Sequence, residues 1–537
     1  MEELLQKYRE NFNDIPSLYE YQKQVIQKLY QRNNTLAIIP TGGGKSLIYQ
    51  LMAMELEGIT LVISPLLALM EEQVNELNEK RKIPSLALNS NISFLDQREI
   101  LRTLGDSYKL LYLSPERLQN PFFRASLIAS GIEVSMIVVD EAHCISQWGS
   151  SFRPDYGQIK GFVEFLKSKN QSPFLLCLTA TLSEVARKDI VTEFYIEKEN
   201  IVIKDIIRTN LSLYFQEVNH EDEKAEYLKE FLAKHQPQKS IAYLYSKKKC
   251  EQYASDFSDN YKVGYYHSSI DAEDKQQTYS QFVNGELDLL FATTAFGMGI
   301  NIPDIDCVIH LQIPNSVEEY YQQVGRGWRR KDVEKECQCL ALWSEVNFDR
   351  RLKEIENEKY TVEHLKEAFN LLIGSAKIKR IGQIVNKDKD ALANSDYNLQ
   401  LIRYKLERYG IIRTIGETNG TPLTIEFYNN TPLWNEIVKS ADDMDSFNYV
   451  SKDLGVSITT IIEHLYEQDL AANIKKLPAM KKDIYFEILV LQLEQSLAEK
   501  IVAEINVEID FKIERLNELK ELFICDNPTQ RITELLS

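Results

Sequence analysis

The sequence predicts an α/β protein made of two tandem parallel-sheet domains, followed by a mainly helical C-terminal region with winged-helix and helix-turn-helix character. Short apolar runs alternate with helical patterns over residues 1–345, and these runs fall into two series. Uninterrupted apolar strands separated by helices are typical of parallel sheets covered on both faces. Beyond about residue 350 the sequence becomes charged and helical. These observations predict two sheets and a separate accessory region.

Each series supplies the strands of one predicted sheet. The first series comprises TLAIIP, ITLVISP, KLLYLSP, MIVVD and FLLCLTAT, at residues 35–40, 59–65, 109–115, 136–140 and 174–181. The second comprises SIAYLYS, KVGYYHS, LDLLFATT, CVIHLQIP and CQCLALWS, at residues 240–246, 262–268, 287–294, 307–314 and 337–344. We therefore expect a first domain over residues 1–205 and a second over residues 206–348.

A winged-helix-like domain is expected over residues 349–430. Residues 398–412 have the pattern of an amphipathic helix, and residues 412–428 follow with Asn419-Gly420, a favourable two-residue hairpin turn. A helix followed by a hairpin is the outline of a winged helix. The hairpin tip carries no aromatic side chain, so it is either a duplex-splitting wing or an ordinary stabilising hairpin.

The last predicted domain covers residues 431–537. Within it, YVSKDLGVSITTIIEHLY (449–466) indicates a helix, a glycine-containing turn and a second helix. Such a helix-turn-helix pattern serves DNA binding and protein contact about equally. Residues 480–524 are acidic and helical with heptad-like Leu and Ile, and we expect a helical hairpin there rather than a long coiled coil.

Composition narrows the class of protein. The chain has 537 residues, 44% hydrophobic and 26% charged, and it contains no run near the roughly 18 apolar residues of a membrane helix. Its polar, acidic beginning does not resemble a secretory signal, and its seven scattered cysteines fit a reducing cytoplasm. A net charge of −18 argues against a surface that binds nucleic acid everywhere, but it leaves room for a local basic groove.

A phosphate-binding loop is predicted at PTGGGKS, between an apolar strand and a helical segment. Glycines let the backbone approach phosphates, and the helix N-terminus supplies amide donors. We expect Lys45 to neutralise charge on the β- and γ-phosphates of ATP and the Ser46 hydroxyl to hold Mg²⁺. The predicted nucleotide-binding residues of this loop are Thr41, Gly42, Gly43, Gly44, Lys45 and Ser46.

Two further motifs complete a predicted ATPase site. Asp140 is the last residue of MIVVD and Glu141 follows it, and a carboxylate at the carboxyl end of a strand lies over the crevice that holds the phosphate loop. Asp140 is expected to hold Mg²⁺ and Glu141 to polarise the attacking water. In QQVGRGWRR, Arg326 and Arg329 are three residues apart, so a helix would place them on one face, towards a γ-phosphate held by the first domain.

The order of these motifs resembles that of superfamily-two helicases of the RecQ type. The resemblance extends over about residues 15–345 and is carried by PTGGGKS, SPLLALMEEQV, YLSPERL, DEAHCISQWGSSFRPDY, LTAT, ATTAFGMGINIPD and QQVGRGWRR. The stretch CISQWGSSFRPDY discriminates this family from other proteins with a DEAH sequence. The resemblance implies two RecA-like domains and an ATP-dependent DNA helicase. It also implies that the aromatic-rich loop after DEAH couples bound single-stranded DNA to ATP hydrolysis.

The resemblance implies roles for further residues. In the aromatic-rich loop, base stacking and coupling fall to Gln147, Trp148, Phe152 and Arg153. His143 either links the acids to LTAT or to the second domain, or is a structural histidine. Gln22 matches a glutamine that reads adenine, Tyr19 stands where the family usually has arginine, and Gln322 completes the nucleotide set. Contacts to DNA phosphate are expected from Ser64, Ser268 and Thr293, although each could be a plain loop hydroxyl.

This sequence departs from the family in its accessory region. Residues 346–400 contain no cysteine, so we expect no structural zinc where the family carries a four-cysteine module. GRGWRR replaces the usual GRAGRDG, and Trp328 is expected to pack on the C-terminal region. A set of basic residues could contact phosphate or form a solvated helix face: Lys377, Lys379, Arg380, Arg403 and Arg408.

The leading functional hypothesis is an ATP-dependent DNA helicase that moves 3′ to 5′ on single-stranded DNA and acts in repair, recombination or genome defence. Its expected partners are single-stranded and forked DNA, and proteins that bind through residues 430–537. Alternatives are a translocase without efficient unwinding, an ATP-gated DNA-binding scaffold and, with less support, an RNA helicase.

Overall fold

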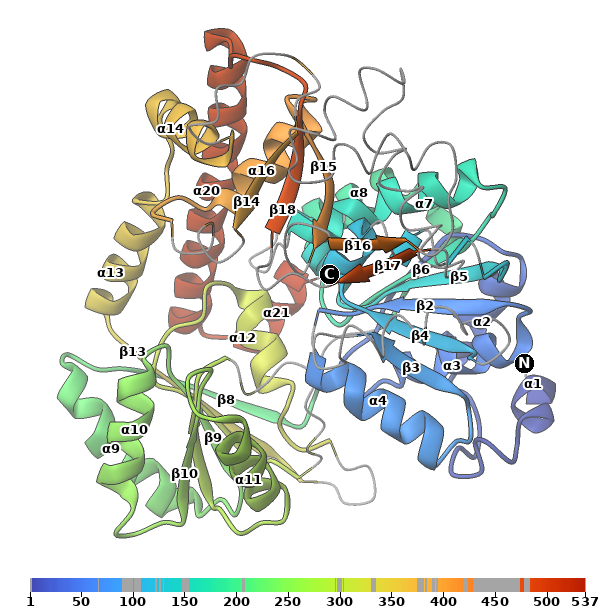
Figure 1. Ribbon diagram of the computed structural model, residues 1–537. Coiled ribbons are helices and arrows are strands. Elements are labelled where there is room, and N and C mark those ends of the chain that lie inside the picture. The colour runs from blue at the N-terminus through green and yellow to red at the C-terminus, as the bar shows by residue number, and fades with distance from the viewer. Residues whose placement is uncertain are drawn as a thin grey trace.

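The computed structural model describes residues 2–536 except 66, 89–99, 101–107, 121–122, 125–126, 129, 147–153, 205–207, 295, 297–301, 303, 330–334, 374–380, 382–383, 389–391, 393–394, 419–423, 428–473 and 478–482. The described residues form two lobes, each built on a parallel sheet, and an accessory region that lies beside both (Figure 1). The predicted fold class, two parallel-sheet domains followed by a helical C-terminal region, is confirmed.

Lobe one contains a seven-stranded parallel sheet of order β3-β4-β2-β5-β6-β1-β7. All residues of the central strands β5 and β6 are buried, as uninterrupted apolar runs require when helices cover both faces. Its strands are β1 (Thr35–Ile38), β2 (Ile59–Ile63), β3 (Ser85–Leu88), β4 (Leu110–Leu113), β5 (Val134–Val139), β6 (Phe174–Thr179) and β7 (Ile201–Ile203). Its helices are α1 (Glu2–Lys7), α2 (Glu20–Tyr30), α3 (Lys45–Glu55), α4 (Leu67–Glu79), α7 (Gln158–Ser168) and α8 (Glu184–Glu193), with the 3₁₀ turns η2 (Pro115–Gln119), η3 (Ala142–Ile145), η4 (Pro154–Gly157) and η5 (Lys198–Asn200).

Lobe two contains a six-stranded parallel sheet of order β10-β11-β9-β12-β13-β8. Its strands are β8 (Leu211–Glu217), β9 (Ser240–Tyr243), β10 (Val263–Tyr266), β11 (Leu289–Ala292), β12 (Cys307–His310) and β13 (Cys337–Trp343). Its helices are α9 (Glu221–His235), α10 (Lys247–Phe257), α11 (Ala272–Val283) and α12 (Val317–Val324). The chain passes from the first sheet to the second between β7 and β8, because these two strands belong to different sheets.

The accessory region is built around a three-stranded antiparallel sheet of order β14-β18-β15. Its helices are α13 (Glu345–Glu356), α14 (Val362–Ile373), α16 (Leu399–Arg408), α20 (Gln495–Ile524) and α21 (Pro528–Leu536). Its strands are β14 (Ile384–Asp388), β15 (Ile412–Thr418), β16 (Thr424–Phe427), β17 (Ile474–Leu477) and β18 (Asp483–Ile488).

The predicted hairpin over residues 412–428 is wrong in its pairing. β15 pairs with β18, and β16 pairs with β17, so the two strands that flank Asn419-Gly420 have different partners. A two-residue turn signal specifies a local reversal only when the strands on either side bury more surface against each other than against distant partners. Here α16 leads into β15 as predicted, but the strand that completes the sheet comes from residues 483–488.

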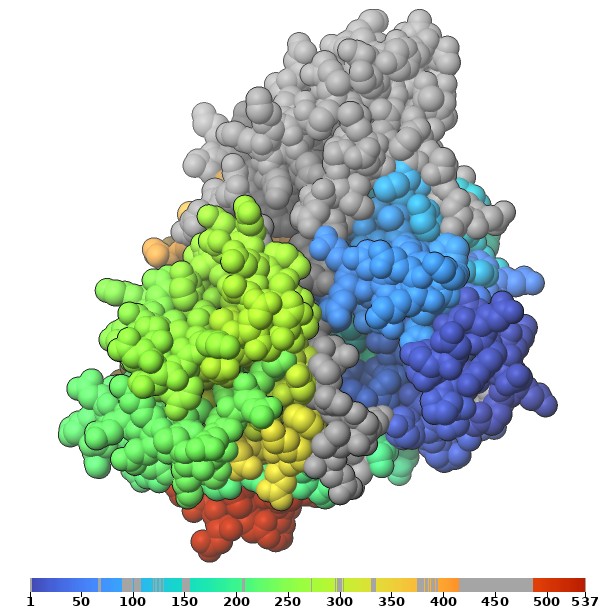
Figure 2. Space-filling view, turned by 90° about the horizontal axis from the view of Figure 1, so that it is seen from below, coloured from blue at the N-terminus to red at the C-terminus, as the bar shows by residue number. Residues whose placement is uncertain are grey.

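The helical prediction for residues 480–524 also needs correction. Its first part is strand β18, and the remainder is one helix, α20, of 30 residues rather than a hairpin. The short α21 follows it, and Figure 2 shows the C-terminal part of the chain against lobe two. The helix-turn-helix predicted at residues 449–466 lies outside the described residues.

Candidate nucleotide and nucleic-acid site

The phosphate loop joins β1 to α3, where the sequence predicted it. Gly42 and Gly44 have φ of 80° and 74°, a left-handed backbone that side chains with a Cβ rarely adopt. A Cβ on Gly43 would lie 2.5 Å from Ile39 Cγ2 and 2.9 Å from the Pro40 carbonyl oxygen. Lys45 is the first residue of α3, and its Nζ donates to the Ile39 carbonyl at 3.3 Å. The glycines therefore shape the loop, and the lysine lies inside its curve.

The structure places Gln22 against this loop. Its Nε2 lies 3.3 Å from the Gly43 carbonyl and 3.2 Å from the Gly44 carbonyl, and its Oε1 accepts from the Tyr19 backbone N–H at 2.9 Å. Both ends of the amide are thus engaged within the chain. Tyr19 remains 46% exposed and stacks on Tyr21 with the ring centroids 5.4 Å apart.

The acid pair lies at the carboxyl end of β5, in the central part of the lobe-one sheet. Glu141 has φ of 50°, which is unusual for a residue with a Cβ, and its N–H donates to Asp140 Oδ1 at 3.0 Å. His143, on η3, has Nδ1 3.3 Å from Glu141 Oε2 and 3.1 Å from Thr179 Oγ1. His143 therefore lies between the acids and LTAT, and Thr179 in turn donates to the Thr181 carbonyl at 2.9 Å.

Burial and mutual charge give the two acids different ionisation. Burial, together with the charge of Glu141, raises the pKa of Asp140 to about 6. Burial alone would raise the pKa of Glu141 as well, but its hydrogen bond with His143 opposes this. The charges of Lys45 and Arg326 act in the same direction as that bond, and they lower the pKa of Glu141 to about 2. Glu141 is therefore held as a carboxylate.

The residues present fit a bound Mg²⁺. The Ser46 hydroxyl on the first turn of α3 and the Asp140 carboxylate are the oxygen ligands that Mg²⁺ prefers. Two neighbouring buried carboxylates repel each other, as the raised pKa of Asp140 shows, and a divalent cation would relieve that repulsion.

The two predicted arginines face this crevice from lobe two. Arg326 is 8% exposed, its Nε has no hydrogen-bond partner among the described residues, and its charge acts on Glu141. Arg329 Cδ lies 3.8 Å from the position that a Cβ on Gly42 would occupy. Burial and the charges of Arg326 and Arg208 lower the pKa of Arg329 to about 9. A buried and a half-buried guanidinium group beside the phosphate loop have the charge and geometry that suit a polyanion.

The altered arginine motif has a steric explanation. A Cβ on Gly327 would lie 2.2 Å from Cys337 Sγ on β13, so the thiol occupies the space that a larger residue would need. Trp328, expected to pack on the C-terminal region, donates its N–H to the Ile305 carbonyl, and Lys335 Nζ lies 4.9 Å from its ring. These contacts are all within lobe two.

Two supporting residues carry no motif and were missed. Arg208 Nη1 donates to the Gly325 carbonyl at 2.9 Å, and its backbone N–H donates to the Tyr321 hydroxyl at 2.8 Å, which braces the arginine segment. The Tyr21 hydroxyl donates to the Gly43 carbonyl at 2.8 Å.

The predicted Gln322 lies half-buried on α12. It is next to Gln323, whose Oε1 lies 2.7 Å from His310 Nε2.

The predicted DNA contacts are only partly described. Gln147, Trp148, Phe152 and Arg153 lie outside the described residues. The other three follow parallel strands at their carboxyl ends. Ser64 is buried, and its hydroxyl has no partner among the residues described; Thr293 is nearly buried and Ser268 is exposed.

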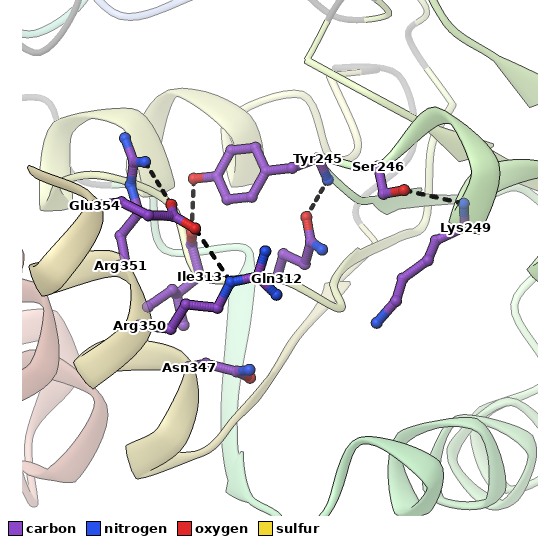
Figure 3. Close-up of a pocket in the computed structure, with 9 residues that line it drawn as sticks. All are labelled: Tyr245, Ser246, Lys249, Gln312, Ile313, Asn347, Arg350, Arg351 and Glu354. Atoms are coloured by element: carbon purple, nitrogen blue, oxygen red, sulfur yellow. Dashed lines mark hydrogen bonds and ion pairs between the residues drawn. The ribbon is translucent and has the colours of Figure 1, made fainter.

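A cavity of about 530 Å³ lies at the same edge of lobe two, after β9 and β12 (Figure 3). Its lining includes Lys249, Arg350 and Arg351, with Glu354 as the one acid among the lining residues. Glu354 pairs with Arg350 at 3.1 Å and with Arg351 at 2.8 Å. Tyr245 is 43% exposed beside them. The lining therefore carries a positive excess and an aromatic ring.

Comparison with protein families matches both lobes. Residues 19–189 match the DEAD/DEAH box helicase family, and residues 223–331 match the helicase conserved C-terminal domain. The fold and the matched family models together place the chain among two-lobed proteins of helicase superfamily two.

Individual relatives narrow this class. The ATP-dependent DNA helicase RecQ of Bacillus subtilis (strain 168) is 37% identical over 340 residues, 63% of this chain and 56% of that protein. The probable ATP-dependent DNA helicase RecS of the same organism is 32% identical over 370 residues, 68% of this chain and 72% of that protein. The chain belongs to the RecQ-type family of superfamily-two helicases. It spans 56% of that RecQ and 48% of RecQ from Pasteurella multocida (strain Pm70), about half of each.

Solved structures share the fold. The helicase Lhr of Mycobacterium smegmatis bound to ssDNA and AMP-PNP matches 99% of this chain and 94% of its own, with a TM-score of 0.52 and 14% identity. The DUF1998 helicase MrfA bound to DNA matches 76% of this chain and 57% of its own, with a TM-score of 0.53 and 17% identity. Within the described residues, no helix is both long enough and apolar enough to span a membrane.

Proposed function

We propose that this protein is an ATP-dependent DNA helicase, which couples ATP hydrolysis to 3′-to-5′ translocation on single-stranded DNA and to duplex unwinding. One observation carries the proposal: Arg326 and Arg329 of lobe two face the phosphate loop and acid pair of lobe one. A site split between two lobes makes hydrolysis depend on their closure, and closure is the movement that a motor needs.

Each residue of the crevice has a role in this proposal. The phosphate loop and Lys45 hold the triphosphate, and Ser46 and Asp140 would hold Mg²⁺, which when bound neutralises phosphate charge. Glu141, kept ionised by His143, accepts a proton from the attacking water. Arg326 and Arg329 stabilise the charge that develops on the transferred phosphoryl group. The exposed face of Tyr19 stacks on adenine.

DNA is proposed to cross the carboxyl edges of both sheets. Ser64, Thr293 and Ser268 lie there, and the basic cavity of Figure 3 adds cationic side chains beside the exposed ring of Tyr245. Cations suit backbone phosphates and aromatic faces suit bases, and neither requires a particular sequence. We propose single-stranded and forked DNA as ligands, protein partners for residues 430–537, and a cytoplasmic role in repair, recombination or genome defence.

The proposal is tested by comparing ATP hydrolysis and strand displacement on single-stranded, forked, 3′-tailed and 5′-tailed DNA. We expect DNA to stimulate hydrolysis and only duplexes with a 3′ tail or fork to be unwound. Glu141→Gln should abolish hydrolysis while DNA affinity stays within twofold, because the carboxylate acts on water and not on DNA. Glu199→Gln, an exposed acid on η5, serves as the matched control and should behave like wild type. A rate of ATP hydrolysis that is the same with and without DNA would contradict the proposal.

The aromatic-rich loop is tested separately. Trp148→Ala is expected to keep the rate of hydrolysis without DNA and to lose most of the stimulation by DNA. The reason is that bases could no longer stack on this side chain, so DNA binding would not be coupled to the acid pair. Unchanged stimulation would remove the loop from the mechanism.

A translocase with little unwinding is the second candidate. Two observations favour it. Residues 346–400 contain no cysteine, and β15 and β16 pair with different strands, so they do not form the hairpin of a simple duplex-splitting wing. DNA-stimulated hydrolysis and directional displacement of streptavidin from biotinylated single strands, without duplex separation, would favour this candidate.

A further inference from the structure

Helix α20 contacts two different parts of the molecule with its two ends. It has 30 residues, which gives a length of about 45 Å. Figure 1 shows it running from the accessory sheet towards lobe two, with α14 and α16 beside one part and α12 and α21 beside the other. A helix of this length is longer than a three-stranded sheet needs as a cover.

The C-terminal end of α20 packs on the part of lobe two that presents the arginines. The Phe523 ring lies 4.7 Å from Phe215 and 5.6 Å from Tyr320, centroid to centroid. About two turns earlier on the helix, Arg515 Nη1 lies 3.4 Å from Glu318 Oε1, and both side chains are largely buried. Tyr320 and Glu318 belong to α12, the helix that leads directly into Arg326. Movement of this end of α20 therefore moves the arginine helix.

The N-terminal half of α20 is fixed to α16. Lys405 is fully buried, and its Nζ pairs with Glu508 and lies 3.5 Å from Glu504 Oε2. The Tyr409 hydroxyl also bonds Glu504. An ion pair buried in this way is costly to open, because each charge would be left unpaired in a low-dielectric surrounding. Helices α16 and α20 therefore move as one unit.

The opposite side of α16 docks on lobe one, directly after the aromatic-rich loop. Arg403 Nη2 lies 2.6 Å from Asp155 Oδ1 with both side chains buried, so Arg403 is not a free phosphate contact. A Cβ on Gly157 would lie 2.3 Å from the Tyr404 ring, so glycine is needed for this close approach. A cavity of about 580 Å³ lies between α8 and α20 beside this contact, and α16 residues line part of it.

One residue connects this docking point to the acids. The Tyr156 hydroxyl, on the same 3₁₀ turn as Asp155, donates to the Asp140 carbonyl at 3.0 Å. A continuous series of packed side chains therefore runs from the backbone of the acid pair through η4, α16 and α20 to α12 and the arginines. This series joins the lobes outside the nucleotide crevice.

We propose that α16 and α20 form a strut that sets the separation of the two lobes, with Arg403 and Phe523 as positioning residues for closure around ATP. Neither residue touches nucleotide; each fixes one end of the strut. Loss of either end lets the lobes close in more than one register, so the arginines meet the triphosphate less often. The effect on ATP turnover rests on the proposed function, whereas the effect on lobe separation does not.

The primary test measures the distance between spin labels at two exposed positions, Lys169→Cys on lobe one and Lys234→Cys on lobe two, in a Cys525→Ser background. With a non-hydrolysable ATP analogue bound, the unaltered strut should give one narrow distance distribution. Arg403→Gln or Phe523→Ala should broaden it at least twofold. The double variant should be no broader than the worse single variant, because both break the same connection. An unchanged distribution in both single variants would overturn the strut.

Matched variants separate positioning from general stability. Arg413→Gln removes an exposed ion pair with Glu487 inside the accessory sheet and should leave the distribution narrow. Exchanging the charges, Arg403→Asp with Asp155→Arg, should restore the narrow distribution if the pair itself sets the distance. In the same variants, kcat for DNA-stimulated hydrolysis should fall about tenfold while the KM for ATP stays within twofold. If wild type shows no stimulation by DNA, the proposed function fails, and the distance measurement still decides the strut.

Discussion

The two lobes are joined at two junctions of opposite character. In the nucleotide crevice, Arg326 and Arg329 face the phosphate loop, and Arg326 Nε has no hydrogen-bond partner among the described residues. At the junction made by α16, Arg403 pairs with Asp155, and Lys405 pairs with Glu508. The crevice therefore contains positive charge that a bound anion would pair, whereas the charges at the α16 junction are paired with acids of the chain itself.

This difference indicates what each junction is for. Buried charge without a partner costs free energy, so it persists where binding a ligand repays that cost. Buried charge with a partner resists separation, because opening the pair exposes both ions to the same cost. The crevice is thus suited to repeated opening and closing, and the α16 junction to permanent attachment.

The largest expected effect comes from the crevice. Arg326→Ala should lower kcat for ATP hydrolysis by about 10³-fold, because arginines in this role contribute factors of about 10³ to 10⁵. Its free energy of unfolding should stay the same or rise slightly, since removal of Arg326 relieves repulsion of Arg329. Steady-state kinetics and urea unfolding measure the two quantities. Arg413→Ala, on an arginine of the accessory sheet whose side chain is 54% exposed, is the control for loss of a guanidinium.

A loss of less than tenfold in kcat, or a marked loss of stability, would show that Arg326 belongs to the packed structure and not to the ligand site.

The α16 junction should show the opposite result. Lys405→Ala leaves Glu508 buried without its partner, and we expect unfolding free energy to fall by about 3 to 5 kcal/mol. Replacing both residues with apolar ones, Lys405→Met with Glu508→Leu, should recover most of this loss. The exposed pair of Arg413 gives the control, where Arg413→Ala should cost at most about 1 kcal/mol. Equal costs for Lys405→Ala and Arg413→Ala would show that the junction is solvated.

A smaller effect tests the packing behind the arginines. Gly327→Ala places a methyl group 2.2 Å from Cys337 Sγ, and overpacking of this kind costs about 1 to 3 kcal/mol. Cys337→Ala should restore part of the loss by removing the sulfur. Gly161→Ala is the matched control, because nothing lies within 4 Å of a Cβ there and alanine favours the interior of α7. Thermal denaturation of the three variants checks the order, and a stable Gly327→Ala would refute the steric explanation.

Much of the motor could be predicted from sequence, because its signals are local. Each of the ten apolar runs contains a strand, and PTGGGKS and Asp140-Glu141 follow strands whose carboxyl ends share one crevice. The missed strands of the two lobes have weaker signals. β3 has only four residues and β7 only three, and β8, whose residues are half-buried or exposed, has neither an apolar run nor a clear alternation.

The accessory region could not be predicted in the same way, because its pairings are distant. β15 pairs with β18, although residues 419–482 separate them in the sequence, and no local pattern predicts a partner so far along the chain. Arg403 was expected to contact phosphate or to lie on a solvated helix face, yet Arg403 and the neighbouring Lys405 are both buried by partners on other elements. Arg208 lies between β7 and β8 in the chain and belongs to no motif, so only the structure shows that it contacts the segment that carries the arginines.

The smallest expected effect concerns α12, the helix that leads into Arg326 and packs on α20. His310 is buried beneath it, with Nε2 2.7 Å from Gln323 Oε1, and burial lowers its pKa from 6.5 to about 4 although the bond to Gln323 opposes the shift. In the unfolded chain, His310 becomes protonated as the pH falls below 6.5, whereas in the folded chain it stays neutral until about pH 4. Stability from this group is therefore complete above pH 6.5 and falls as the pH decreases, by about 2 kcal/mol at pH 5.

His310→Gln keeps a donor for Gln323 and cannot titrate, so the variant should lose less stability than wild type between pH 7.5 and pH 5. Urea unfolding at both pH values measures the difference, and the exposed His220→Gln supplies the control with no expected change in slope. If wild type and His310→Gln lose stability in parallel, His310 is hydrated in the folded protein. Helix α12, which leads into Arg326, would then pack on a hydrated site, and its packing would be less tight than that of the α16 junction.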